Sequence, residues 1–131
     1  MSVRWYSVVV DCHDVKAQGY WWANVLGWKI AYEADNEVVV APAHLMDESR
    51  TIPRHERGQG LVFVPVPESK ELKNRLHVDL APGPDDDQQA EVRRLESLGA
   101  RRVNVGQTDQ VSWVVLADPE GNEFCVLSPR D

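Results

Sequence analysis

Short apolar runs alternate with two amphipathic stretches along this chain, and the same order of elements occurs twice. In the first half, the stretch Val15–Leu26 predicts a helix because its apolar residues recur at helical spacing. Asp14 can cap this helix at its start, and Gly27 can end it. The β-branched and aromatic runs that predict strands lie at residues 4–10, 28–32, 37–40 and 61–66.

The second half repeats this plan about seventy residues on, where Leu98 and Gly99 correspond to Leu26 and Gly27. A helix is expected over 88–98, with the aspartates at 85–87 favouring its start. Its strands are expected at 75–80, 102–105, 113–116 and 124–127.

The last two of these strands flank the sequence DPEGN at 118–122. Pro119 and Gly121 favour a tight reversal there, so we predict a β-hairpin.

This repeat predicts an α+β fold of two tandem βαβββ modules, about 1–70 and about 71–131, in one domain of 131 residues. Each module would form a curved sheet with a helix on one face. Two open faces placed together would form a cup-shaped mixed sheet able to bind a small molecule. The stretch 42–60 has no clear period and is long for a connection, so we expect a binding loop or a lid there.

Composition narrows the classes of function. A formal charge of −7 argues against a nucleic-acid partner, because phosphate binding needs a basic surface. No stretch is apolar for long enough to cross a bilayer, and the N-terminus carries no signal-peptide pattern. Cys12 and Cys125 have no metal-binding or redox spacing, which is typical of a reduced, cytoplasmic protein.

Strand alternation selects the candidate site residues. In the second module, Arg75, His77 and Asp79 should share the cup face, and Glu123 and Cys125 should share it on the last strand. His77 is the candidate acid or base, and Arg75 could hold an anionic ligand group.

Three further residues are candidates for ligand contact. Ser7 should face the cup from the first strand. Trp113 and Phe63 are the best candidates to stack on a ligand, although strand parity is uncertain by one residue at each.

Three segments resemble the vicinal oxygen chelate superfamily, which contains glyoxalase I, extradiol dioxygenases and bleomycin-resistance proteins. They are 8–14 followed by WWANVLGW at 21–28, KNRLHVD at 73–79, and DPEGNEFC at 118–125. KNRLHVD resembles a glyoxalase-like subgroup. The resemblance implies the fold deduced above and a homodimer. It also implies, for the superfamily's enzymes, a divalent ion held by His, Glu, His and Glu.

Little of that ligand set is kept. The first-strand His position is Ser7, and 61–66 offers no carboxylate. The fifth-strand His is present as His77, and the last Glu position is Cys125. One match in four does not make an octahedral site for a hard ion, so we predict no metal and no other cofactor.

Three alternatives remain open for the same residues. His77 and Cys125 could hold a softer ion such as Zn²⁺, with Glu123 or Asp79 completing the set. Cys125 could also be a nucleophile activated by His77, or simply a small buried apolar residue.

The function that fits best is binding of a small organic molecule in the cup without the superfamily's usual metal. The alternative is a lyase, isomerase or dioxygenase that uses a rewired metal or acid–base site around His77 and Cys125. Glyoxalase I activity itself is not expected, because that chemistry needs a metal to stabilise an enediolate. The ligand's identity does not follow from these patterns, because one fold hosts many chemistries.

Overall fold

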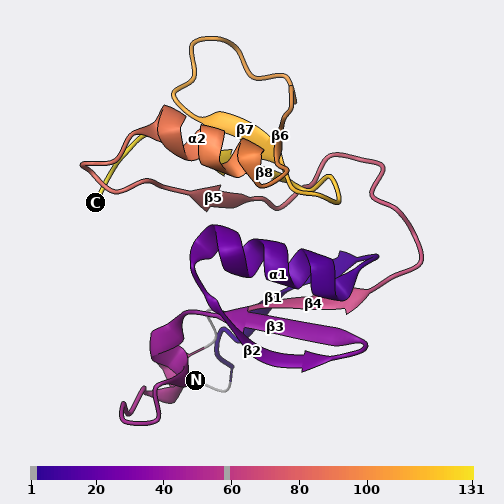
Figure 1. Ribbon diagram of the computed structural model, residues 1–131, viewed down its shortest axis with the longest axis vertical. Coiled ribbons are helices and arrows are strands. Elements are labelled where there is room, and N and C mark those ends of the chain that lie inside the picture. The colour runs from indigo at the N-terminus through magenta and orange to yellow at the C-terminus, as the bar shows by residue number, and fades with distance from the viewer. Residues whose placement is uncertain (1–2, 58–59) are drawn as a thin grey trace. The chain divides into compact units, whose positions relative to one another are not determined.

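The structure of this protein is a computed structural model that describes residues 3–57 and 60–131. It consists of two compact units, Met1–Ser69 and Lys70–Asp131 (Figure 1). Over these described residues, each unit contains one α-helix and one four-stranded sheet. The predicted α+β fold of two modules is therefore confirmed.

The first unit is a complete βαβββ module. Its sheet has the strand order β1-β4-β3-β2, in which β1 and β4 are parallel and the other pairs are antiparallel. Its elements are β1 (Ser7–Cys12), α1 (Val15–Leu26), β2 (Lys29–Ala34), β3 (Glu37–Ala41) and β4 (Gly60–Pro65).

The second unit has the same topology. Its strand order is β5-β8-β7-β6, in which β5 and β8 are parallel and the other pairs are antiparallel. The equal order of strands in both sheets confirms the internal repeat. The elements are β5 (Val78–Leu80), α2 (Gln88–Ser97), β6 (Arg101–Arg102), β7 (Val114–Ala117) and β8 (Glu123–Val126).

Helix α1 begins and ends at its predicted residues, and α2 begins as predicted at Gln88 but ends at Ser97, one residue before the predicted end. The Asp14 carboxylate accepts a hydrogen bond from the Ala17 backbone N–H at 3.0 Å, which satisfies one free donor at the start of α1. Gly27 ends α1 in the left-handed region, at φ 66°. Asp87 caps α2 in the same way, through the Gln89 N–H at 2.9 Å.

The core of the first unit lies between α1 and the sheet. Val38 and Val40 on β3 and Phe63 on β4 have no exposed surface. Gly19 on α1 lies directly over this cluster, because a Cβ added there would be 2.5 Å from Val38 Cγ1. Helix and sheet therefore approach more closely than any side chain at position 19 would allow.

The burial of Phe63 corrects one site prediction. Phe63 faces α1 and packs in the core, so it is not available to stack on a ligand. Strand parity decides this outcome, because a shift of one residue moves a side chain to the other face of the sheet.

Three strands differ from their apolar runs in length or position. β1 begins at Ser7 rather than at residue 4, because its pairing with β4 begins at Ser7 with Gly60. β5 contains only Val78–Leu80, the residues that pair with β8, although the pattern predicts a strand from residue 75. β6 contains only Arg101–Arg102, the residues that pair with β7, although the pattern predicts a strand over 102–105. In all three cases the partner strand sets the limit.

The connection at 42–60 contains two short 3₁₀ helices, η1 (Ala43–Met46) and η2 (Arg54–Glu56). Residues 58–59 of this predicted loop lie outside the described residues. Described residues of this connection line an open cavity of about 670 Å³ beside the sheet of the first unit. The prediction that it forms a lid stays untested.

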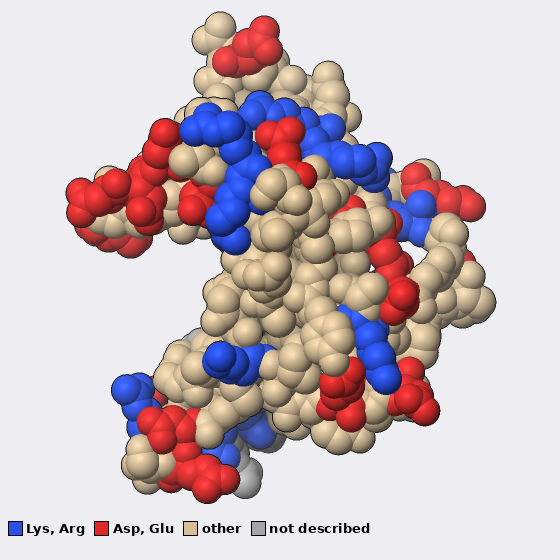
Figure 2. Space-filling model, viewed as in Figure 1, with Lys and Arg blue, Asp and Glu red and all other residues tan. Residues whose placement is uncertain are grey.

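Charged side chains of both signs are interspersed on the face shown in Figure 2. Basic side chains gather over α2 and β6 there. These two elements include Arg94, which lies 3.0 Å from Glu91, and Arg102, which lies 3.5 Å from Glu96. Among the described residues, no helix combines the length and the apolar character needed to span a membrane.

Candidate functional site

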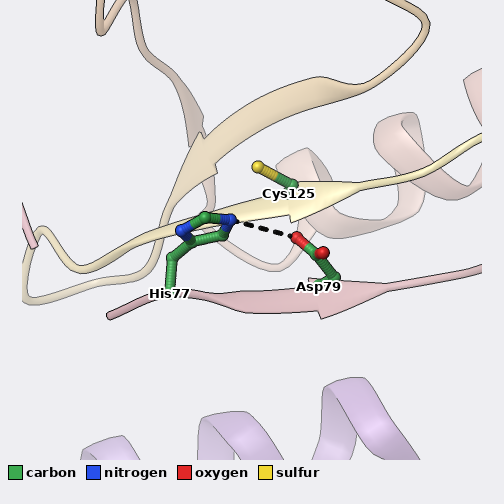
Figure 3. Close-up of side chains that lie close together, drawn as sticks. All are labelled: His77, Asp79 and Cys125. Carbon is green, nitrogen blue, oxygen red and sulfur yellow. Dashed lines mark ion pairs between the residues drawn. The ribbon is translucent and has the colours of Figure 1, made fainter. Parts of the chain in front are cut away.

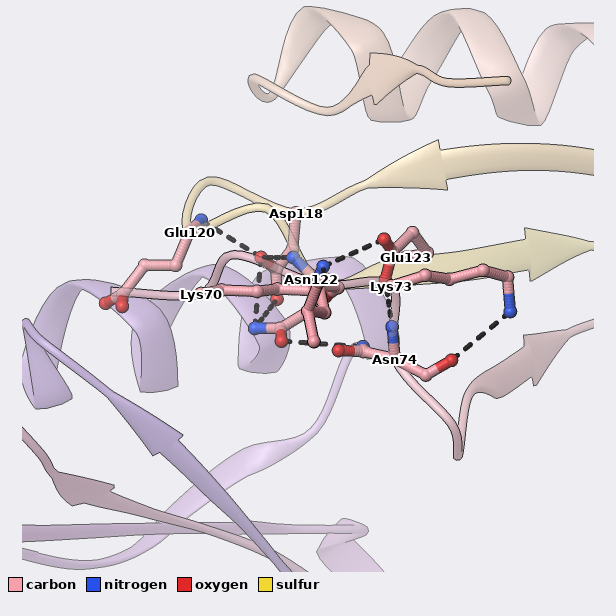
Figure 4. Close-up of polar contacts among 8 residues, drawn as sticks. Lys70, Lys73, Asn74, Asp118, Glu120, Asn122 and Glu123 are labelled. Carbon is pink, nitrogen blue, oxygen red and sulfur yellow. Dashed lines mark hydrogen bonds and ion pairs between the residues drawn. The ribbon is translucent and has the colours of Figure 1, made fainter. Parts of the chain in front are cut away.

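The β7–β8 turn is built around Asp118, which is fully buried (Figure 4). Its Oδ1 atom accepts hydrogen bonds from the backbone N–H groups of Glu120 at 3.0 Å and Asn122 at 2.9 Å. Its Oδ2 atom accepts from the Asn122 side-chain amide at 3.1 Å. Gly121 takes the positive φ of 93° that the turn requires. Asp118 therefore holds β8 in place from inside the turn.

Glu123, the first residue of β8, is bound to the segment before β5 (Figure 4). Its Oε1 atom lies 2.8 Å from Lys70 Nζ, and its Oε2 atom accepts the Asn74 N–H at 3.0 Å. Burial raises the pKa of this carboxyl, but Lys70 and the backbone donors outweigh that effect and hold the pKa below its ordinary value. Glu123 is thus occupied by a structural contact.

This contact predicts a measurable pH dependence. The folded-state pKa of Glu123 is depressed, so its stabilisation is present above the unfolded pKa and is lost as pH falls through the folded pKa. We expect Glu123→Gln to lower the free energy of unfolding by about 1–2 kcal/mol at pH 7. The difference from wild type should shrink as pH falls below the ordinary pKa of a glutamate and disappear once pH is below the lowered folded-state pKa.

Urea unfolding at several pH values would check this expectation. Glu71→Gln is the matched control, because Glu71 is an exposed glutamate in the same segment before β5 as Lys70 and Asn74. Two results would contradict a stabilising role for the Glu123 contact. One is an equal loss in the free energy of unfolding for both substitutions, and the other is a loss for Glu123→Gln that persists at low pH.

Three side chains that could take part in chemistry converge on one face of the second sheet (Figure 3). Asp79 on β5 and Cys125 on β8 are register neighbours, and neighbours in parallel strands share a face. His77 lies two residues before Asp79, with its Nε2 atom 3.3 Å from Asp79 Oδ1. The ligand atoms of all three side chains lie within 4.8 Å of one another.

The electrostatics of this cluster keep the thiol protonated. Burial raises the pKa of Cys125, and the negative charge of Asp79 and a hydrogen bond with it raise this pKa further. Lys73 acts in the opposite direction but does not outweigh them. Since the thiolate is the nucleophilic form, this environment disfavours the predicted alternative of Cys125 as a nucleophile.

The cluster borders an open cavity of about 490 Å³ in the second unit, a size typical of small-molecule sites. Trp113, directly before β7, lines it and is 42% exposed, which is unusual for so large an apolar side chain. Further apolar lining comes from Val105, Val115 and Leu127.

Polar lining outside the cluster includes Gln107, whose side chain stiffens the loop between β6 and β7. Its Oε1 atom accepts from the Val105 N–H at 2.8 Å, and its Nε2 atom donates to the Val103 carbonyl at 3.0 Å. The turn residues around Gly106 mark this loop in the sequence, but no pattern links it to the site. Lys73 also lines the cavity, and sequence reasoning missed both residues.

The predicted site residues differ in which cavity, if any, they line. His77, Asp79, Trp113, Glu123 and Cys125 all line the cavity of the second unit. Arg75 is exposed and is not part of that lining, so the structure gives no support to its predicted role as an anion clamp. Ser7 belongs to the first unit, where it lines the cavity beside the 42–60 connection.

Comparison with known proteins identifies the class. The sequence model of the glyoxalase-like domain matches residues 7–127, so this chain belongs to the glyoxalase-like domain family. No protein of curated function matches the chain in sequence.

Solved structures share the fold at low sequence identity. A glyoxalase/bleomycin resistance protein/dioxygenase family enzyme from Burkholderia phytofirmans PsJN is 14% identical, with a TM-score of 0.66 over 96% of this chain and 98% of that chain. A mutant of the fosfomycin resistance protein FosX from Listeria monocytogenes, complexed with Mn(II), is 11% identical, with a TM-score of 0.67 over 98% and 91%. A possible glyoxalase from Bacillus cereus is 15% identical, with a TM-score of 0.63 over 96% and 99%.

The donor set of the second unit does not fit the hard divalent ion usual in the superfamily. Such ions prefer six oxygen-rich ligands, whereas the cluster offers one imidazole, one carboxylate and one thiol. The other carboxylate on β8, that of Glu123, is already held by Lys70 and Asn74.

Proposed function

We propose that this protein binds a small organic molecule in the cavity of the second unit, without the superfamily's usual hard metal ion. The observation that carries this proposal is Trp113, a large aromatic side chain left 42% exposed at a cavity of about 490 Å³. Ligand sites typically combine such apolar walls with a few placed polar groups. The polar groups here are Lys73, His77, Asp79 and Gln107.

The lining also indicates the chemistry of the ligand. An indole face with valine and leucine neighbours favours a planar, largely apolar molecule. The imidazole of His77 and the carboxylate of Asp79, each about half exposed, favour a hydrogen-bonding substituent on that molecule. Compounds of phenol or aromatic amine type are therefore the first to test.

Labelling the tryptophan indoles with ¹⁵N would test this proposal, because each of the five tryptophans gives its own resonance. Trp113→Phe identifies the Trp113 signal. With a library of phenols and aromatic amines, we expect binders to shift the Trp113 signal, and Trp113→Ala to weaken their binding by about tenfold, the equivalent of ~1.4 kcal/mol.

Trp28→Phe is the control, because Trp28 belongs to the first unit and is not among the residues that line the cavity of the second unit. A library that shifts no signal at Trp113, or binders unaffected by Trp113→Ala, would contradict the proposal.

The enzymatic alternative rests on the convergence of His77, Asp79 and Cys125. His77 with Asp79 forms an acid–base pair that a bound molecule could reach from the cavity. Cytoplasmic location and a homodimer stay predictions of the sequence.

A further inference from the structure

Lys73 brings a positive charge to the cavity of the second unit. Among the described residues that line this cavity, it is the one lysine or arginine. An ammonium group offers three N–H donors, and the contact described for this one is to its neighbour, the Asn74 backbone carbonyl, at 3.2 Å. Lys73 is exposed, so a bound molecule can reach the ammonium group.

The two carboxylates of the cavity lining pair with other side chains. Glu123 Oε1 lies 2.8 Å from Lys70 Nζ, and both side chains of this pair are largely buried. Asp79 Oδ1 lies 3.3 Å from His77 Nε2. Within the described part of the chain, no carboxylate lies at ion-pair distance from Lys73. A ligand can therefore supply the countercharge of this lysine.

The segment before β5 holds the backbone of Lys73 in place (Figure 4). Asn74 donates its backbone N–H to Glu123 Oε2 at 3.0 Å, and Lys70 holds the other oxygen of the same carboxylate. These two contacts lie on either side of Lys73 in the sequence and tie the segment to the first residue of β8. The charge of Lys73 also reaches Cys125 in the cavity lining, where it opposes the rise in the pKa of the thiol that burial causes.

We propose that the molecule bound in this cavity is an aromatic acid, with its ring on Trp113 and its carboxylate on Lys73. This inference rests on the proposed function and adds the charge of the ligand to it. Both residues line the same cavity of about 490 Å³. A hydrogen bond between an ammonium and a carboxylate is roughly twice as strong as a neutral one. One ammonium matches the single charge of a carboxylate, whereas a phosphate would need further cations.

Three phenols of similar shape and different charge test this inference on the full chain. They are the anionic para-hydroxybenzoate, the neutral para-hydroxybenzamide and the cationic para-hydroxybenzylamine. The shift of the Trp113 indole signal gives a dissociation constant for each at neutral pH. We expect the benzoate to bind about fivefold more tightly than the amide at low ionic strength. Added salt should reduce this preference, because it screens an exposed charge pair.

Substitutions at Lys73 show whether this side chain sets the preference. Lys73→Gln removes the charge, so we expect it to weaken benzoate binding about fivefold, to leave amide binding within about a factor of two and to strengthen benzylamine binding. Lys73→Arg keeps the charge and should keep the preference for the benzoate. Arg75→Gln is the matched control, because it removes an equal charge from an exposed residue outside the lining and should change none of the three affinities.

Three results would overturn the inference: equal binding of the benzoate and the amide, a benzoate preference that survives Lys73→Gln, or an equal loss of that preference in Arg75→Gln. In each of these cases the shift at Trp113 persists, and binding of an organic molecule in the cavity stands. If none of the three phenols and no member of the wider library shifts the Trp113 signal, the proposed function fails and the inference fails with it. The two failures are therefore distinguishable.

Discussion

Replacing Asp118 by alanine is expected to lower the free energy of unfolding by about 3–4 kcal/mol. The carboxylate is fully buried, and its Oδ1 atom accepts two backbone N–H groups of the β7–β8 turn. Removing it leaves those donors without their partner and opens a cavity, and both effects destabilise. The turn orients β8 and hence Cys125, so the variant should also lose organic-ligand binding.

Urea unfolding followed by circular dichroism measures this effect, and two variants calibrate it. Asp118→Asn keeps one acceptor oxygen in the turn, so we expect it to cost roughly half as much as the alanine variant. Asp109→Ala removes an exposed carboxylate and should change stability by less than about 0.5 kcal/mol. If Asp118→Ala changed the free energy of unfolding as little as Asp109→Ala, the stability of the turn would not depend on the buried carboxylate.

Replacing Gly19 by valine is expected to lower the free energy of unfolding by about 3–4 kcal/mol. A Cβ at this position would lie 2.5 Å from Val38 Cγ1 and 3.6 Å from a ring carbon of Phe63, both in a fully buried cluster. The added methyl groups force α1 away from the sheet, which costs more than the helix gains from losing a glycine. Gly19→Ala should show a smaller loss, about 1–2 kcal/mol.

A double-mutant cycle checks the mechanism behind this prediction. Val38→Ala alone should destabilise by leaving a cavity, but combined with Gly19→Ala the new methyl group occupies part of that space. We therefore expect the double variant to be more stable than the sum of the single effects predicts, by about 1 kcal/mol. Additive effects would show that the close approach at Gly19 does not limit the packing. Asn24→Ala, on the exposed side of α1, is the control for helix propensity.

Local patterns in the sequence were sufficient to predict the helices and strands and their order. Helix α1 begins and ends at its predicted residues because Asp14 and Gly27 act through contacts only a few residues long. The hairpin around Gly121 and the repeated order of strands are equally local in origin. Strand limits were predicted less well, since the ends of β1 and β5 depend on partner strands that are distant in the sequence.

The predicted site residues show the same difference between local patterns and contacts that are distant in the sequence. Alternation with a period of two predicted that Asp79 and Cys125 share a face, and they are register neighbours on β5 and β8, because side-chain direction in a strand is a local property. His77 lies just before β5, and its side chain converges with theirs. The same rule left the parity of Phe63 open, and packing against α1 decided that it belongs to the core.

The sequence by itself thus determined the α+β repeat and the identity of the residues that could carry chemistry. Only the tertiary structure decided which carboxylate is free to act beside His77 and Cys125. Glu123 is held by Lys70, which is 53 residues away in the chain, whereas Asp79 faces the cluster. Spacing within one strand cannot reveal such a pairing, because it depends on where a distant segment of the chain packs.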